Sequence, residues 1–174
     1  MNKFWGHFKT ITTHKLKVMG LCFKLGLYKR GLLHDLSKYS PVEFLAGVKY
    51  YQGYRSPIDR EKEVLGYSKG WLHHKGCNRH HWEYWLDFDA NKQLVGMPMP
   101  KVFIAEMFCD RVAASMIYKK ENYHDGSALE YFLGGQHYII MHKDTKETIH
   151  RWLSYLAANG LDKTVEYIKK ELKQ

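Results

Sequence analysis

The sequence predicts an all-α protein, a single bundle of about seven or eight helices. Apolar residues recur at spacings of three and four along most of the chain, which is the periodicity of an amphipathic helix. Several of these segments follow residues typical of helix N-termini, and no convincing pair of alternating strands is present. With 174 residues, 45% of them hydrophobic, the chain is expected to bury a sizeable core as one domain over 1–174.

Four helices are expected in the first half of the chain. The apolar stripe over residues 2–25 predicts the first, which Gly26 would end. A second helix includes residues 32–36. Residues 40–43, Ser-Pro-Val-Glu, have the pattern of a capping box and predict the start of a third. Residues 56–76 open with the similar Ser-Pro-Ile-Asp and predict one long helix.

The second half is expected to hold further helices and one polar loop or short hairpin. Asn78 would cap the first of these helices, and Asp110 lies inside the helix that begins at Lys101. The segment 127–174 is expected to be a C-terminal helical extension, opened by further capping patterns. The expected helices span residues 78–85, 101–117, 127–142, 144–160 and 162–172. The loop or hairpin is expected over residues 87–96.

The adjacent pair His34-Asp35 is the strongest candidate for chemistry. An imidazole nitrogen and a carboxylate oxygen from neighbouring residues can bind one divalent ion, and this ligand set suits zinc, iron, manganese or similar metals. A His-Asp dipeptide also arises by chance, so the pair gains weight only from other candidate ligands in the chain.

Candidate ligands precede and follow this pair. His14 lies in the apolar stripe of the first helix, where it is either a ligand or a hydrogen-bonded core histidine. Four histidines fall within residues 73–81, and His74 is in phase with the apolar face of its helix, whereas His73 is the weaker candidate. Asp110 lies in an apolar helix, where a carboxylate is costly unless it is paired or bound to metal.

Four other residues are candidates for catalysis or substrate binding. Lys38 either faces a phosphate or is a solvated residue at a helix end. Glu43 fits a helix cap better than a catalytic acid, and both roles are kept open. Glu106 lies one turn before Asp110 on the same helix face and is a second candidate catalytic carboxylate. Trp82 either walls the site or fills the core, and the core is favoured.

The formal net charge of +9 favours an anionic partner. Because the positive charge is spread along the chain, a small phosphorylated ligand such as a nucleotide ranks above nucleic acid. Cys22, Cys77 and Cys109 form neither a disulfide framework nor a zinc-finger spacing. The sequence contains no signal-peptide core and no run of about 20 apolar residues. We therefore expect a cytoplasmic protein without a membrane partner, and the oligomeric state stays open.

The order of these residues resembles the HD-domain superfamily of metal-dependent phosphohydrolases. That order is His14, then His34-Asp35, then a later histidine, then Asp110, and Lys38 matches the His-Asp-x-x-Lys motif of many members. The chain also resembles a family of small uncharacterised proteins with a domain of unknown function, which brings no activity with it. This second likeness covers residues 14 to about 115 and rests on 14–15, 31–44, 71–74, 78–85 and 99–110.

The superfamily resemblance implies an HD-like bundle that holds one or two divalent ions, such as manganese, iron, zinc, cobalt or nickel. Carried over to this chain, the first ion would take His14, His34, Asp35 and Asp110. The second would use His74 and His80 or His81, with Asp35 bridging the two ions. The spacer at residues 76–79 departs from the superfamily pattern, so the choice of ligands among the four histidines stays open.

The function expected from this resemblance is a metal-dependent phosphohydrolase acting on a nucleotide, a cyclic nucleotide or another small phosphate ester. Asp35 would be essential because a bound ion acidifies the attacking water. Lys38, Lys75 and Arg79 would hold phosphate oxygens, with Trp82 as a further substrate contact. Two alternatives remain: a di-iron oxygenase on the same scaffold, and a non-catalytic binding protein in which metal only stabilises the fold.

Overall fold

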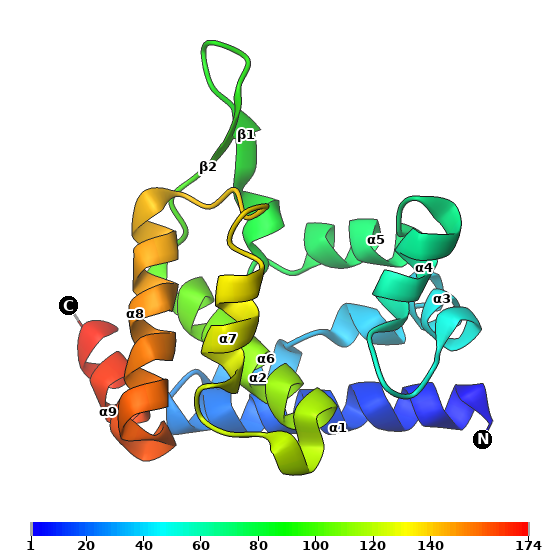
Figure 1. The fold of residues 1–174 in the computed structure, drawn as a ribbon, viewed down its shortest axis with the longest axis horizontal. Helices are drawn as coiled ribbons and strands as arrows, with labels where there is room; N and C mark the ends of the chain where they lie inside the picture. The colour runs from blue at the N-terminus through cyan, green and yellow to red at the C-terminus, as the bar shows by residue number, and fades with distance from the viewer. Residues whose placement is uncertain (1, 174) are drawn as a thin grey trace.

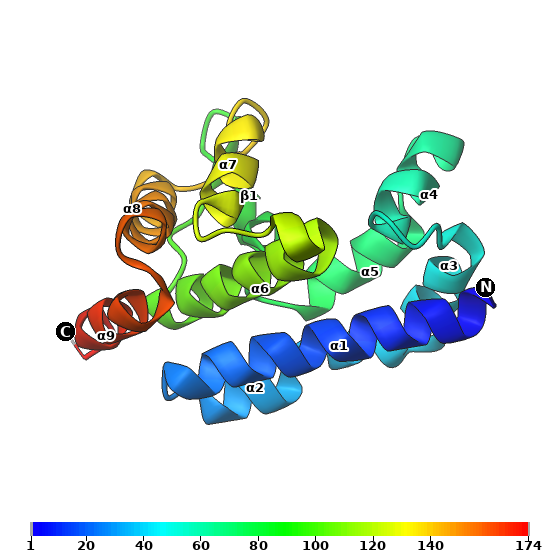
Figure 2. The same ribbon diagram turned by 60° about the horizontal axis from the view of Figure 1, so that its bottom comes forward.

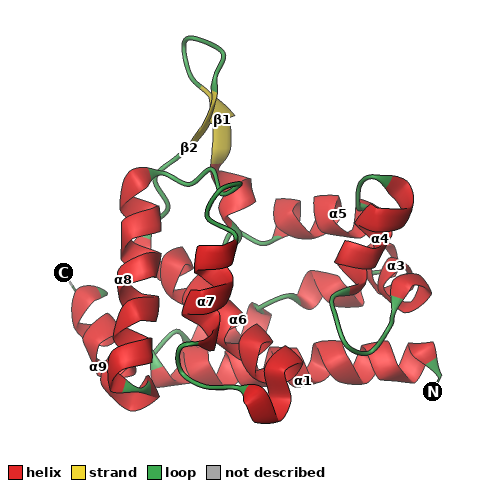
Figure 3. Cartoon of the chain, in the orientation of Figure 1, coloured by secondary structure: helices red, strands yellow, loops and turns green. Residues whose placement is uncertain are grey.

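Helices make up nearly all the regular structure of the computed structural model, which describes residues 2–173. The expected all-α class is confirmed, with nine α-helices in this range and one small antiparallel hairpin (Figure 3). The α-helices are α1 (Lys3–Lys24), α2 (Tyr28–Leu33), α3 (Pro41–Tyr50), α4 (Pro57–Leu65), α5 (Lys69–Cys77), α6 (Lys101–Lys119), α7 (Ser127–Gly134), α8 (Lys143–Asn159) and α9 (Leu161–Glu171). Short 3-10 helices are η1 (Leu36–Tyr39), η2 (Trp82–Trp85) and η3 (Lys120–Asn122), and the hairpin strands are β1 (Leu86–Phe88) and β2 (Leu94–Gly96).

Two long helices, α1 and α6, pack against each other and organise the molecule (Figure 2). Helix α2 folds back along α1, while α3, α4 and α5 gather near the N-terminal end of α1 (Figure 1). Helices α7 and α8 pack against α6, α9 packs against α8, and the β1–β2 hairpin projects from the body. No helix among the described residues is long and apolar enough to cross a membrane.

The apolar core lies around α6, between α1 on one side and the three C-terminal helices on the other. Helix α8 contributes Trp152, Leu153 and Leu156, all fully buried. Cys22 and Cys109 are also fully buried in this core, whereas Cys77 is exposed. The segment after residue 127 therefore builds the main core together with α6.

The part of the molecule formed by α3, α4 and α5 buries few large apolar side chains. The buried residues of α5 are Gly70 and His74, and the buried residue of α4 is Glu61. Ser68 hydrogen-bonds Glu61 across the α4–α5 turn. Buried polar groups need hydrogen-bond partners, and this region supplies them. Polar contacts therefore contribute more to its stability than they do in the part of the molecule that contains the apolar core.

The single helix expected over 56–76 was wrong, since α4 and α5 are separate. Gly66 adopts the left-handed conformation (φ 78°), which ends α4. Ser68 then caps α5, because its hydroxyl accepts a hydrogen bond from the Trp71 amide at 2.9 Å.

Other expected boundaries also needed correction. The segment after Asn78 is a turn followed by η2 and contains no α-helix, and the predicted helix over 127–142 ends at Gly134, where a second glycine follows. The expected capping boxes at Ser40 and Ser127 do not form: Ser40 precedes α3 without a side-chain cap, and Ser127 is already the first residue of α7. His142 caps α8 in place of Asp144, and Gly160 precedes α9 in place of Asp162.

Candidate metal centre

His34 and Asp35 lie in the break between α2 and η1, where the sequence had predicted a helix. His34 is extended (φ −51°, ψ 126°) and Asp35 is left-handed (φ 51°), a conformation that aspartate tolerates better than most residues. The Lys15 ammonium donates to the carbonyl oxygens of Leu32 at 2.8 Å and His34 at 2.9 Å, which holds the break against α1. This backbone turns two neighbouring side chains towards one centre, whereas neighbours on a helix point apart.

The first cluster joins α1, the His34-Asp35 break and α6. His14 Nε2 lies 2.8 Å from Asp110 Oδ1 and 3.8 Å from Asp35 Oδ2. His34 Nε2 lies 3.2 Å from Asp35 Oδ2 and 3.8 Å from Asp110 Oδ1. The four residues expected to bind the first ion therefore offer atoms that all lie within 4.8 Å of one another.

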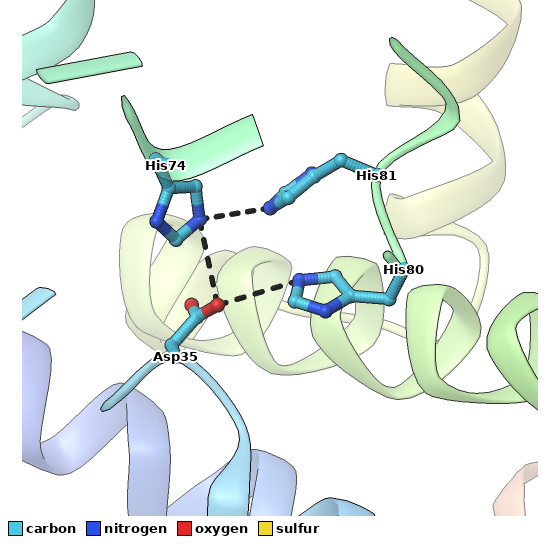
Figure 4. Close-up of side chains that lie close together, drawn as sticks. All are labelled: Asp35, His74, His80 and His81. Carbon is cyan, nitrogen blue, oxygen red and sulfur yellow. Dashed lines mark hydrogen bonds and ion pairs between the residues drawn. The ribbon is translucent and has the colours of Figure 1, made fainter. Parts of the chain in front are cut away.

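The second cluster joins Asp35 to α5 and to the turn before η2 (Figure 4). His74 Nε2 and His80 Nε2 each lie 3.4 Å from Asp35 Oδ1. His81 Nε2 lies 2.8 Å from His74 Nε2, so both members of the His80-His81 pair reach the cluster. His73 belongs to neither cluster, in line with its weaker prediction.

Asp35 is shared by the two clusters, one oxygen to each. Its Oδ2 faces His14 and His34, and its Oδ1 faces His74 and His80. The side chain is 1% exposed, so water does not compensate its charge. The Lys38 ammonium, 2.6 Å from Oδ2, does so in part.

The free donor atoms of the clusters fit divalent ions. Nε2 of His34 and of His80, together with Asp35 Oδ1, are buried without a hydrogen-bond partner. His14 Nε2 and Asp35 Oδ2 make no well-aligned hydrogen bond either, although each has a short ion-pair contact, with Asp110 and Lys38 respectively. Such atoms are costly unless something else binds them. Imidazole nitrogen with carboxylate oxygen is a ligand set that zinc, iron, manganese, cobalt and nickel accept. The residues thus could hold one or two metal ions.

Glu106 orients one histidine of each cluster. Its Oε1 lies 3.0 Å from His34 Nδ1 and 3.3 Å from His80 Nδ1, which leaves Nε2 of each ring for the centre. Arg30 pairs with the other oxygen at 3.0 Å. A carboxylate behind a ligating histidine is a common way to fix its tautomer and orientation. This position, behind the rings, suits a positioning residue better than a catalytic acid.

Glu43 has the corresponding position behind α5. Its two oxygens lie 2.7 Å from Nδ1 of His73 and 2.7 Å from Nδ1 of His74. The expected capping role of Glu43 was wrong, because its side chain turns away from the start of α3 and is buried against these rings. Glu43 thus fixes Nε2 of His74 towards Asp35.

Nearby carboxylates shift the pKa values of the cluster strongly. Burial would lower the pKa of His34, but the charge of Asp35 and the hydrogen bonds to Asp35 and Glu106 outweigh it and raise that pKa to about 10. Burial would raise the pKa of Glu106, yet its bonds to His34 and His80 hold it at about 2. Burial lowers the pKa of the His81 imidazole well below its usual range. The centre therefore attracts cations and includes a neutral imidazole.

The expected substrate-binding residues surround the centre unevenly. Lys38 pairs with Asp35. Lys75 is half-buried and makes no ion pair with a described residue, whereas Arg79 is exposed and its guanidinium carbon lies 5.5 Å from the centre of the Tyr84 ring. Trp82 packs on the apolar core, as favoured from the sequence.

Several supporting residues were not found from the sequence. The sequence pattern around Lys15 and Arg30 is that of ordinary surface cations. In the structure, Lys15 donates to the Leu32 carbonyl oxygen and Arg30 donates to Glu106, and both contacts join residues distant in sequence. Ser37 and Asn78 lie beside His74, with Asn78 Nδ2 donating to Ser37 Oγ at 2.8 Å. For the supporting residue Glu106, the sequence did contain a signal, because Glu106 lies one turn before Asp110 on the same helix face.

Comparison with known proteins gives one match. The model of DUF5662, described as a family of unknown function, matches residues 3–155. No curated protein matches the chain, and no solved structure does.

Proposed function

The chain belongs to the DUF5662 family, and because that family is of unknown function, we propose from the site itself that this protein is a metal-dependent phosphohydrolase. Its substrate would be a small phosphate ester, with a nucleotide as the first candidate. The observation that carries this proposal is the buried Asp35 carboxylate, shared between two clusters of closely spaced imidazole and carboxylate groups, several of whose buried atoms make no hydrogen bond.

The arrangement of the first cluster supports a relationship to the HD-domain superfamily. His14, the His34-Asp35 pair and Asp110 come together from three separate segments in the combination that the resemblance implies. The second cluster supports a site for two ions, because His74 and His80 face the other oxygen of Asp35 and His81 Nε2 lies 2.8 Å from His74 Nε2.

Each part of the chain would have a distinct role in hydrolysis. Divalent ions, when bound, would supply positive charge for the phosphate and the acidification of water. Glu43 and Glu106 keep the histidine rings in the orientation that binding requires. Lys38, whose ammonium lies 2.6 Å from Asp35 Oδ2, would contact substrate oxygens and offset their charge. The net charge of +9 favours approach of an anionic substrate.

Metal analysis of protein purified without a histidine tag, followed by a phosphatase screen with manganese, cobalt and iron, tests the proposal. We expect one or two ions per chain and hydrolysis of at least one phosphate ester. Asp35→Ala should lose both metal and hydrolysis, because it removes the ligand shared by the clusters. Full metal content and full activity in this variant would place the chemistry elsewhere.

Lys38→Ala separates metal binding from substrate binding. We expect it to retain the metal but to hydrolyse the ester more slowly, because the ammonium acts on the substrate's charge. A variant that loses metal together with activity would instead give Lys38 a role in holding Asp35.

A di-iron oxygenase is the second candidate, favoured by the number of protein ligands. The two clusters together offer seven different residues, five of them histidines. Iron bound at two per chain, oxygen consumption with an organic substrate, and no phosphatase activity would support it. If the metal only stabilises the fold, the melting temperature should fall on chelation, and neither screen should detect turnover.

A further inference from the structure

A cavity of about 320 Å³ lies where the start of α1, the end of α3 and helix α4 meet. Its volume is in the range of pockets that bind small molecules, which is about 300–1,000 Å³. Three cations line it, Lys3, Lys49 and Arg60, and no carboxylate of the described residues does. In a chain with 18 acidic residues, a cavity whose charged lining is entirely cationic indicates an anionic ligand.

This cavity is separate from the metal centre. Its lining contains none of the residues that form the two clusters. Lys3 and His14 lie about three turns apart on α1, which corresponds to roughly 16 Å along the helix axis. The start of α1, α3 and α4 lie together at one end of the molecule (Figure 1). A ligand in the cavity would therefore be distinct from a substrate at the centre.

Two tyrosines give the cavity a fixed wall. Tyr50 and Tyr51 are each 9% exposed, and the Tyr51 hydroxyl lies 3.1 Å from Thr10 Oγ1 on α1. Gly6 lets α1 approach this ring closely, because a Cβ there would lie 2.5 Å from Tyr51 Cε1. Both contacts join α1 to the end of α3, so the wall is formed before any ligand binds.

The cations of the cavity have unused hydrogen-bond donors. Lys3 and Lys49 form no ion pair with another described residue, and the Lys49 ammonium lies 5.1 Å from the centre of the Tyr50 ring. Arg60 uses one guanidinium nitrogen for Glu63 at 3.1 Å, which leaves its other donors for a ligand. The C-terminal end of α3 contributes a partial negative charge of roughly half an elementary charge, which the three cations outweigh.

Gln52 supplies a neutral donor to the same cavity. Its Oε1 accepts a hydrogen bond from Arg55 Nε at 2.7 Å, which orients the amide and leaves its NH₂ group for a ligand. Val64 of α4 adds an apolar contact. The lining thus combines positive charge, a hydrogen-bond donor and apolar surface.

We propose that this cavity binds a small organic phosphate, at a site separate from the metal centre. The phosphate oxygens would accept charge-assisted hydrogen bonds from Lys3, Lys49 and Arg60. The organic part of the ligand would lie against Tyr51 and Val64, which form the apolar side of the cavity. This site requires no turnover at the metal centre, so it goes beyond the proposed phosphohydrolase function.

Titration of the isotope-labelled full chain, purified with zinc, with phenylphosphonate tests the site by NMR. This probe carries an anionic phosphonate and a ring, and its carbon–phosphorus bond is not a substrate for phosphate-ester hydrolysis. We expect the amide signals of residues 3–6, 49–52 and 60–64 to shift. Binding should weaken as salt is added, because salt screens exposed charges.

Two charge-removing variants test the role of the cations. Lys49→Met and Arg60→Met should each bind phenylphosphonate roughly 5- to 10-fold more weakly and keep the melting temperature, because both side chains are exposed. The matched control is Lys163→Met, which removes the same charge from an exposed position on α9 outside the cavity. Equal loss of affinity in all three variants would show a response to net charge alone and overturn the proposal.

Val64→Trp tests the space in the cavity and leaves every cation in place. The indole should occupy room that the phenyl ring needs, so phenylphosphonate should lose more affinity than inorganic phosphate does. Val64 is 51% exposed, so the melting temperature should change little. If this variant binds both probes as tightly as the native chain, the cavity is not the site and the proposal fails.

The position of the shifted signals separates this inference from the proposed function. Shifts confined to residues 34–38 and 74–81, unaffected by Lys49→Met, would place the phosphonate at the metal centre and refute the cavity site. A chain that binds no phenylphosphonate refutes it as well. If the cavity signals shift but no ester is hydrolysed with any metal, the phosphohydrolase fails and the cavity site stands.

Discussion

Asp35 adopts a left-handed backbone conformation in which its carboxylate faces histidines on both sides. Non-glycine residues in this region cost of order 1 kcal/mol or more, and they persist where the surrounding structure fixes them. Here the Lys15 ammonium fixes the break through two backbone carbonyl groups. At the residue scale, the geometry of the centre therefore depends on side chains that would not themselves bind a metal.

Glu106→Gln should weaken metal binding without unfolding the protein. The amide of glutamine is uncharged, so its oxygen is a weaker hydrogen-bond acceptor for His34 and His80 than the carboxylate is. The substitution also removes the ion pair with Arg30. Changes to such supporting groups typically cost about 10- to 100-fold in metal affinity. Competition with a fluorescent chelator measures the loss. The control is Glu130→Gln, which removes an exposed ion pair with Lys119 and should leave affinity unaltered. An unaltered affinity in Glu106→Gln would show that His34 and His80 need no such partner.

Metal affinity should fall as the solution is made more acidic. The metal-free chain holds a proton on His34, because nearby carboxylates raise its pKa to about 10. A metal must displace that proton to reach Nε2, so below about pH 10 affinity should rise roughly tenfold per pH unit for each proton released. Chelator competition between about pH 6 and about pH 8 measures the slope. A flat profile would mean that His34 is not a ligand.

At the scale of elements, the close packing of α2 on α1 positions the His34-Asp35 break. Gly31 of α2 permits this approach, because a Cβ there would lie 3.0 Å from Cys22 Cβ and 3.2 Å from the Met19 backbone. Backbone atoms cannot move aside as a flexible side chain can. The two helices would have to separate, and His34 would then move away from His14 on α1.

Gly31→Ala should therefore lower both stability and metal affinity. Overpacking of this kind typically destabilises by about 1–3 kcal/mol. The matched control is Gly20→Ala in α1, where nothing lies within 4 Å of the added Cβ and stability should rise by up to about 1 kcal/mol. Urea unfolding and chelator competition measure the two effects. Gain of stability in both variants would show that α2 can move without cost.

The elements that the sequence predicted well are those with a continuous apolar stripe. Helix α1 and helix α6 were expected almost at their observed limits, because their buried faces repeat over several turns. Prediction failed where polar contacts, rather than apolar burial, decide the structure. The break at Asp35 and the turn before η2 are examples, since both depend on partners distant in sequence.

The candidate ligands could be selected from the sequence because histidine and aspartate are unusual on apolar helix faces. His74 was preferred over His73 from its helical phase, and the structure confirms its burial at 2% exposure. The positions of Glu43 and Glu106 behind the rings could not be derived in this way. Each contacts histidines some 30 to 70 residues away along the chain, a separation that local patterns do not report.

For the whole molecule, the centre lies between two regions that are stabilised differently. Helices α6 and α8 bury many large apolar side chains, whereas α5 buries Gly70 and His74. Helix α5 packs against α3, and its one buried side chain other than glycine, His74, belongs to the second cluster.

Chelation should loosen the α5 region more than the apolar core. Amide hydrogen exchange should accelerate in α5 and in residues 78–85, while α8 keeps its protection. The melting temperature should rise again on adding metal, because a ligand that binds only the folded state adds about 2.7 kcal/mol at a hundredfold excess over its Kd. Uniform acceleration through α8 would indicate that metal supports the entire fold instead.

His14 and Asp110 lie in the middle of two long packed helices, whereas His80 and His81 lie in a turn. Ligands on rigid helices hold their separation, and ligands on a turn can adjust it. We therefore expect the first cluster to discriminate between ions by radius and the second to accept ions of differing size. One chain could then bind two different metals in a fixed order of preference.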